Sequence, residues 1–287
     1  MIDMTMGATR ALLLATTAIL SVNLPSAYAQ VVEVSGNDTR SGPFDNGVQY
    51  RFWDTSTLSA AAAATISGGE QYFQDNSTLN ASAADAIGGG TQTFEATSRL
   101  NASAANAISG GVQRFNSANA LNATAADAIS GGMQIFFSTS TLNASVANAI
   151  SGGTQMFNSF STLNASVANT ISGGSQSFSE DSSLNASVAD AISGGTQSFY
   201  GNSTLDARAA NAISGGTQSF YGNSTLGAWA ANAISGGVQY LFGSSSLRVH
   251  ADNGLTTTTD IRFDNTHGGT GGALMLLGKS TAIGSSR

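Results

Sequence analysis

The stretch ISGGTQSFYGNSTL at Ile192–Leu205 occurs again, letter for letter, at Ile213–Leu226. The step from one copy to the next is 21, and related copies extend in both directions along the chain. The unit reads G-G-x-Q-x-F, five variable residues, then L-N-A-S-A-A-N-A-I-S. A fixed period of this length is the signature of a repeat architecture, in which each unit packs against a near-copy of itself.

The spacing of Leu and Gln measures the period. Leu recurs at a step of 21 in ten copies, which together extend from Asn46 to Thr256. Gln recurs at the same step from Gln71 to Gln239. Gln49 is taken as the first member of the Gln series, with a step of 22 to Gln71, so we expect one extra residue between Gln49 and Leu58, around Arg51–Trp53.

Substitutions among the copies indicate which side chains face the solvent. The position of Ser187 becomes Arg208 and then Trp229 in the next two copies, which only an exposed site accepts. The Asn80 position varies in the same way. Between them Leu79, Ala81 and the position of Ala83 stay apolar, and this alternation with period two predicts a strand.

The Gln–Phe segment alternates in the same way. The residue between Gln92 and Phe94 is Thr93, and it becomes Arg114 and Met156 in later copies. Gln92 and Phe94 are therefore predicted to point inward together, with the Gln side chains hydrogen-bonded to one another from copy to copy.

The alternative to strands is an α-helix over the segment S-T-L-N-A-S-A-A-N-A-I-S-G-G. This segment has an N-cap residue, apolar residues at helical spacing and a terminal Gly. The span is only about nine residues, with Asn and Ser at weak helix positions, which favours strands. We therefore predict an all-β parallel β-helix, a β-solenoid of about ten 21-residue coils that each advance about 4.8 Å. Gly-Gly forms one corner and the Asp85/Asn106 position a second, where αL backbone is tolerated.

The ends of the chain differ from the repeat. Residues 1–29 have the features of a signal peptide: an apolar run at Ala11–Val22 and an A-x-A site at Ala27–Ala29. That run is too short to span a bilayer, so we expect an exported protein. Residues 30–45 are expected to be a lead-in or cap, and 257–287 to form further irregular coils.

Composition excludes several classes of function. The 287-residue chain contains no Cys, which rules out thiolate metal sites and cysteine catalysis, and its net charge of −7 argues against nucleic-acid partners. The recurrent acids, such as Asp85, alternate with Asn in one position, which fits a corner and not catalysis. His250 and His267 lie outside the repeats, and no nucleophile elbow, zinc motif or P-loop occurs. We expect no enzyme activity, no cofactor and no metal site.

The run I-S-G-G-x-Q-x-F…S-x-L-N-A-x-A-x-N-A-I-S-G-G resembles the passenger repeats of AIDA-type autotransporter adhesins. The resemblance covers all ten copies; Phe stands where that family often has Val, and the period is somewhat longer. It implies a right-handed parallel β-helix at the surface of Gram-negative bacteria, acting in adhesion, autoaggregation and biofilm formation. It also implies export through a C-terminal outer-membrane barrel. Only the segment 257–287 follows the last repeat, so we expect a truncated passenger, with export by another machinery as the alternative.

Two sets of residues are candidate sites. The variable residues after each inner Phe are predicted to form an adhesive edge that binds like rods, or glycans and proteins of a host surface. Stacked Arg208 and Trp229 are predicted to form a cation–π pair. The candidate adhesive residues are Phe137, Phe160, Tyr200, Tyr221, Arg208 and Trp229. In the resembled family Ser and Thr of the repeats can carry heptose, which implies a glycosylation column of Ser82, Ser103, Thr124, Ser145, Ser166 and Ser187.

Two other functions remain open at this point. A passive spacer or coat rod would use the same repeat without the variable edge. A polysaccharide-degrading enzyme is the third reading, because parallel β-helices also host such enzymes.

Overall fold

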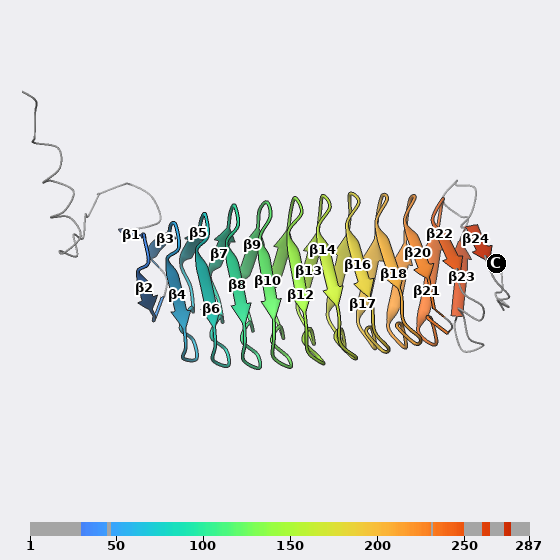
Figure 1. Ribbon diagram of the computed structural model, residues 1–287, viewed down its shortest axis with the longest axis horizontal. Coiled ribbons are helices and arrows are strands. Elements are labelled where there is room, and N and C mark those ends of the chain that lie inside the picture. The colour runs from blue at the N-terminus through green and yellow to red at the C-terminus, as the bar shows by residue number, and fades with distance from the viewer. Residues whose placement is uncertain (1–29, 45–46, 231, 250–259, 265–272, 277–287) are drawn as a thin grey trace, which may run out of the picture.

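The computed structural model describes residues 30–44, 47–230, 232–249, 260–264 and 273–276, and every regular element within these ranges is a β-strand. The strands form two parallel sheets of twelve, one of odd-numbered and one of even-numbered strands (Figure 1). This confirms the predicted β-solenoid and excludes the helical alternative for the repeat. The signal peptide predicted over residues 1–29, together with His250 and His267, lies outside the described residues.

The strands are short and nearly uniform in length. The odd-numbered strands are β1 Gln30–Val34, β3 Val48–Phe52, β5 Glu70–Phe73, β7 Thr91–Phe94, β9 Val112–Phe115, β11 Met133–Phe136, β13 Thr154–Phe157, β15 Ser175–Phe178, β17 Thr196–Phe199, β19 Thr217–Phe220, β21 Val238–Phe242 and β23 Asp260–Asp264. The even-numbered strands are β2 Thr39–Ser41, β4 Thr57–Ala60, β6 Thr78–Ala81, β8 Arg99–Ala102, β10 Ala120–Ala123, β12 Thr141–Ala144, β14 Thr162–Ala165, β16 Ser183–Ala186, β18 Thr204–Ala207, β20 Thr225–Ala228, β22 Ser246–Val249 and β24 Ala273–Leu276.

Each regular coil has three sides. An odd-numbered strand carries Gln and Phe, an even-numbered strand carries Leu and Ala, and a single bridge at the Ile position makes the third side. The register pairs each residue with its equivalent one coil away, as in Gln134 with Gln155. Like side chains therefore stack in columns that run along the rod.

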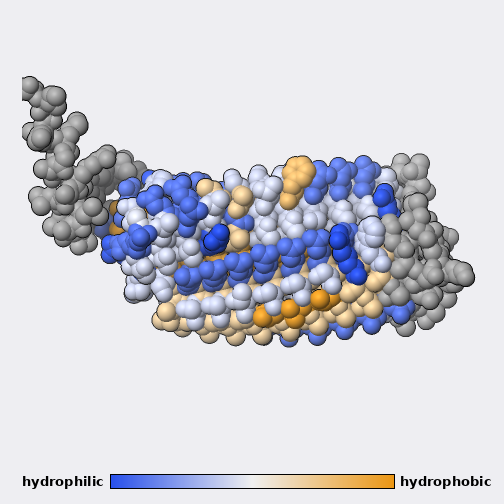
Figure 2. Space-filling model, in the orientation of Figure 1, coloured by the Kyte–Doolittle hydropathy of each residue, from blue (hydrophilic) through white to orange (hydrophobic). Residues whose placement is uncertain are grey.

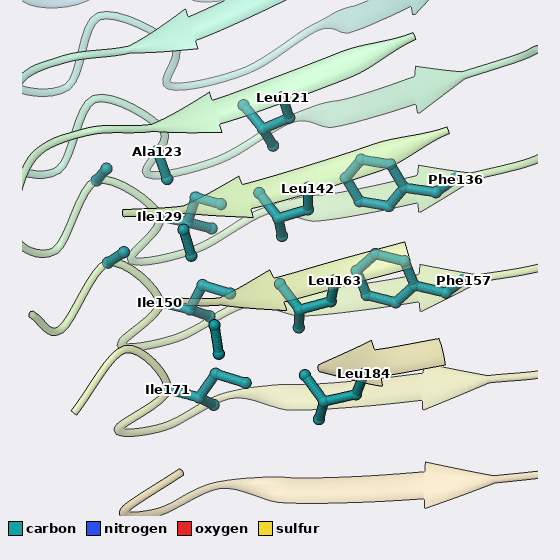
Figure 3. Close-up of a cluster of buried hydrophobic side chains, with 14 of the residues drawn as sticks. Leu121, Ala123, Ile129, Phe136, Leu142, Ile150, Phe157, Leu163, Ile171 and Leu184 are labelled. Atoms are coloured by element: carbon teal, nitrogen blue, oxygen red, sulfur yellow. The ribbon is translucent and has the colours of Figure 1, made fainter. Parts of the chain in front are cut away.

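The core consists of these columns (Figure 3). Phe rings from Phe52 to Phe220 stack with centroids 4.7–4.8 Å apart and planes within 9° of parallel. Leu, Ile and Ala columns fill the remaining interior, and their side chains are fully buried. The ring spacing equals the predicted advance per coil.

A ladder of Gln side chains accompanies the Phe stack. From Gln92 onward, each Nε2 donates to the Oε1 of the preceding Gln at 2.7–2.8 Å. Each Nε2, that of Gln71 included, also donates to the first Gly carbonyl of its own coil at 3.0–3.2 Å. Both amide hydrogens are thus used inside the core, as a buried amide requires. The second bond explains the G-G-x-Q spacing, because Gln closes the Gly-Gly corner that precedes it.

The prediction for Gln49 is wrong. The register places Tyr50, not Gln49, beside Gln71, and Phe52 beside Phe73. Gln49 pairs with Glu70 and donates Nε2 to its Oε2 at 3.1 Å, so the Gln ladder begins at Gln71. The Phe stack keeps a step of 21, and no extra residue is accommodated around Arg51–Trp53.

The predicted corners are confirmed. The second Gly of each pair has φ of 71–78°, and the Asp85/Asn106 column has φ of 52–54°. The first Gly is required by packing instead: a Cβ on Gly152 would lie 2.2 Å from the carbonyl oxygen of Ser130 in the preceding coil. The strand alternation, however, stops at Ala81, and Ala83 lies half-buried beyond the end of β6.

The first and last described coils depart from the regular period. Gln30 pairs with Val48 and Thr39 with Thr57, so the expected lead-in forms a shorter coil with a step of 18. At the other end, Val238 pairs with Asp260 at a step of 22. Leu247 of β22 pairs with Leu274 of β24 at a step of 27, and the further irregular coils expected over 257–287 lie mostly outside the described residues.

Candidate binding surfaces

The exposed residues lie in rows parallel to the rod axis (Figure 2). We call the turns that follow the odd-numbered strands the odd-strand edge, and the turns that follow the even-numbered strands the even-strand edge. Phe137, Phe160, Tyr200 and Tyr221 belong to the odd-strand edge, whereas Arg208 and Trp229 belong to the even-strand edge. The structure therefore divides the six candidate adhesive residues between two edges.

An aromatic stack occupies the C-terminal part of the odd-strand edge and continues onto Phe242, the last residue of β21. The rings of Tyr200 and Tyr221 lie 4.9 Å apart, and those of Tyr221 and Phe242 lie 4.6 Å apart, all nearly parallel. Tyr200 is 43% exposed. The sequence analysis missed Phe242, although it follows Tyr221 by one period and could have been found by extending the column.

The other two aromatic residues of this edge do not join the stack. Phe137 lies in the same column, but Asn158 and Ser179 separate it from Tyr200. Phe160 lies two positions further along its turn, with φ of 65° and 63% exposure. The predicted flat row of aromatics is thus a continuous stack of three rings and two separate rings.

Fewer residues of the variable segment are exposed than the sequence suggested. The fourth of the five positions holds a fully buried Ser, as at Ser161 and Ser203. Its hydroxyl donates to the carbonyl three residues earlier, at 2.6 Å from Ser161 to Asn158 and 2.7 Å from Ser203 to Tyr200. The signal was present in the sequence, because this position is Ser or Asn in every copy.

On the even-strand edge, Arg208 and Trp229 share one carboxylate. Arg208 Nη2 donates to Asp206 Oδ2 at 2.8 Å, and Trp229 Nε1 donates to Asp206 Oδ1 at 3.1 Å. Gly227 makes room for the indole, since a Cβ there would lie 2.7 Å from Trp229 Nε1. The sequence analysis missed the roles of Asp206 and Gly227, and the cation–π pair remains a prediction.

The predicted glycosylation column is exposed at all six positions, from Ser82 to Ser187. Five of the hydroxyls lie 3.3–3.5 Å from a carbonyl of the preceding coil, so they are oriented but only weakly held. Beside it, the Asn column is half-buried, and each Nδ2 from Asn101 to Asn185 donates to the preceding Oδ1 at 2.8–3.1 Å. Sugar attachment stays a prediction.

Near the N-terminal end, the odd-numbered sheet has a hollow of about 260 Å³ on its outer face. Its walls are Arg51, Trp53, Tyr72, Gln74 and Glu95. Burial raises the pKa of the Tyr72 phenol above 10.0, and the hydrogen bond to Glu70 and the negative charge of Glu70 raise it further. The positive charges of Arg51 and Arg114 lower this pKa by smaller amounts. Within the described ranges, no group of three His, Cys, Asp or Glu side chains is placed to hold a metal ion.

Comparison with known proteins finds no related protein. No protein-family model matches the sequence, and neither a curated protein nor a solved structure is significantly similar to it. Among the described residues no helix could cross a membrane. The fold and the surfaces above therefore carry the functional argument.

Proposed function

We propose that this protein is an exported surface adhesin whose rigid β-solenoid binds neighbouring rods or host surfaces side-on. The observation that carries the proposal is the outward aromatic stack of Tyr200, Tyr221 and Phe242 on the odd-strand edge. Aromatic side chains bring large apolar contact area with few rotatable bonds, which makes them effective binding anchors.

The rest of the rod supports binding through many weak contacts. Ser, Thr and Asn side chains line the outer columns. Hydrogen bonds between successive Asn side chains hold the Asn column in a fixed orientation along six coils. Because the register repeats every coil, two aligned rods would repeat each contact along their length, and the weak contacts would act together. The resemblance to autotransporter passengers and the expected signal peptide support a location at the cell surface or outside the cell.

Display of the chain on a non-aggregating bacterium tests the proposal, with cell settling and attachment to host cells as readouts. We expect the wild-type chain to cause settling or attachment, and the triple variant Tyr200→Ser, Tyr221→Ser, Phe242→Ser to lose most of it. The matched control is Asn202→Ser with Asn223→Ser, which changes exposed polar residues of the same turns and is expected to keep full activity.

A passive spacer is the second candidate, favoured by the uninterrupted columns of the core. The same experiment separates the two functions. If the displayed chain is intact at the surface and neither settling nor attachment occurs, the adhesin proposal is wrong and the spacer becomes the better account.

A further inference from the structure

The hollow on the outer face of the odd-numbered sheet is lined by large aromatic and charged side chains. Its five residues occupy two columns: Arg51 and Tyr72 between the inner Gln and Phe positions, and Trp53, Gln74 and Glu95 just after the strands. In the coils β15–β17 the same columns hold only the small side chains Ser177, Ser179 and Ser198, apart from Tyr200. The same columns also hold Arg114 and, near the other end, the Tyr200–Tyr221–Phe242 stack, but at the N-terminal end aromatic and charged side chains together surround one hollow.

The backbone holds these side chains in fixed positions. The sheet ladder continues one residue past each strand, from Trp53 N to Val34 O at 2.9 Å, Gln74 N to Phe52 O at 2.9 Å and Glu95 N to Phe73 O at 2.8 Å. Adjacent coils are about 4.8 Å apart, so Trp53 and Glu95, two coils apart, are separated by about 10 Å along the axis. That span accommodates one sugar ring at a time.

Hydrogen bonds orient the polar groups around the hollow. The Tyr72 hydroxyl donates to Glu70 Oε2 at 3.0 Å, which fixes the phenol ring. Gln74 Nε2 donates to Glu95 Oε2 at 2.6 Å. Gln74 Oε1 is buried and accepts no hydrogen bond from any described residue, and because it is closed to solvent a ligand in the hollow would contact it only after this side chain moves.

We propose that this hollow is a binding site for a neutral sugar, a single pyranose ring at the end of or within a glycan. Trp53 and Tyr72 offer aromatic surface to the apolar C–H face of the ring. Arg51 supplies donors and Glu95 acceptors to the hydroxyl groups, through hydrogen bonds strengthened by their charges. The two charges are opposite, so the site does not require a charged ligand, and a carboxylate in the wall disfavours phosphate.

The size of the hollow agrees with this ligand. Pockets for drug-sized molecules run from about 300 to 1,000 Å³. A hollow of about 260 Å³ suits one ring. This site does not depend on the proposed adhesive stack, which begins at Tyr200, six coils away from Tyr72 along the odd-numbered strands.

Tryptophan fluorescence tests the site directly, because the chain contains only two Trp. In the full chain with Trp229→Phe, the emission reports on Trp53 alone. Methyl β-D-galactopyranoside, methyl α-D-glucopyranoside, methyl α-D-mannopyranoside and N-acetylglucosamine are the probes. We expect at least one of them to change the emission in a saturable way.

Two variants and one control define the outcome. Tyr72→Ser removes one aromatic face and Glu95→Gln weakens a charge-assisted hydrogen bond. Each, made in the Trp229→Phe chain, is expected to raise the Kd about tenfold. Tyr200→Ser in the same chain is the matched control and is expected to leave the Kd unchanged. The proposal is overturned if none of the four probes changes the emission through the millimolar range, or if the control weakens binding as much as the two variants.

Discussion

The rod contains two amide ladders of the same geometry, one inside and one outside. The inner Gln ladder continues without a substitution from Gln71 to Gln239, and every member is fully buried. The outer Asn ladder has similar hydrogen-bond lengths but ends at Asn185, where Asp206 and then Gly227 follow in its column. Water can replace a lost partner on the outside but not in the core, so burial makes the amide obligatory.

Replacement of a Gln in the middle of the inner ladder is expected to have the largest effect. Gln155→Ala removes the donor to Gln134 Oε1 and the acceptor of Gln176 Nε2, and it opens a cavity beside the Phe stack. Each orphaned buried group costs about 1–3 kcal/mol, and the cavity adds to this, so we expect a loss of about 3–6 kcal/mol. Urea unfolding and hydrogen exchange of neighbouring amides measure it. A loss below that of the Asn variant described below would contradict the account.

The corner that supports the inner ladder comes next. Gly152→Ala would press a Cβ against Ser130 O at 2.2 Å, and Gly152 O also accepts from Gln155. We expect a loss of about 2–4 kcal/mol in the free energy of unfolding, since the opposing backbone is fixed by its own ladder. Gly88→Ser is the control: a Cβ there meets no atom within 4 Å, and other copies carry Ser, so its midpoint should stay at the wild-type value.

The matched change on the outer ladder is expected to be small. Asn143→Ala removes the bonds to Asn122 and from Asn164, as many side-chain bonds along the axis as Gln155→Ala removes. Because the column is only half-buried, water can satisfy the freed groups, and we expect a loss under about 1 kcal/mol. If this variant and Gln155→Ala shift the urea midpoint equally, burial does not distinguish the two ladders.

The smallest expected effect on stability comes from the contact between Tyr72 and Glu70 on the outer face of β5. The raised pKa of Tyr72 means that its protonated form is favoured by folding, so this contribution to stability is present below pH 10 and is lost as pH rises through the folded pKa. Glu70→Gln removes the charge and should move the pKa of Tyr72 back towards 10.0. Ultraviolet titration of the phenolate, with Tyr72→Phe subtracted, measures the shift; no movement would show that Glu70 does not act on it.

Much of the repeat could be predicted because the substitutions among its copies show which positions are buried and which are exposed. Gln92 and Phe94 were placed inside and the Ser82 column outside, and the αL corner at Asp85 was inferred from the alternation of Asp with Asn. The error at Gln49 arose from following the Gln spacing. The Phe52-to-Phe73 spacing of 21 was also visible and would have given the observed register.

The candidate surfaces were harder to predict because they depend on contacts between different columns. Asp206 joins Arg208 to Trp229, and Gly227 admits the indole. The N-terminal hollow likewise combines residues of three coils that look unrelated in the alignment of copies. A repeat pattern predicts which side chains face out, but not which exposed neighbours from different columns meet.

The most direct test of the account measures the advance of the coils. The chain has no Cys, so Ser82→Cys with Ser145→Cys, and Ser82→Cys with Ser187→Cys, place spin labels three and five coils apart on one exposed column. At about 4.8 Å per coil, the two separations should be about 14 Å and 24 Å. Pulsed and continuous-wave electron paramagnetic resonance would confirm the in-register solenoid if the separation grows by about 10 Å between the two pairs. Equal separations, or a growth far from this value, would contradict it.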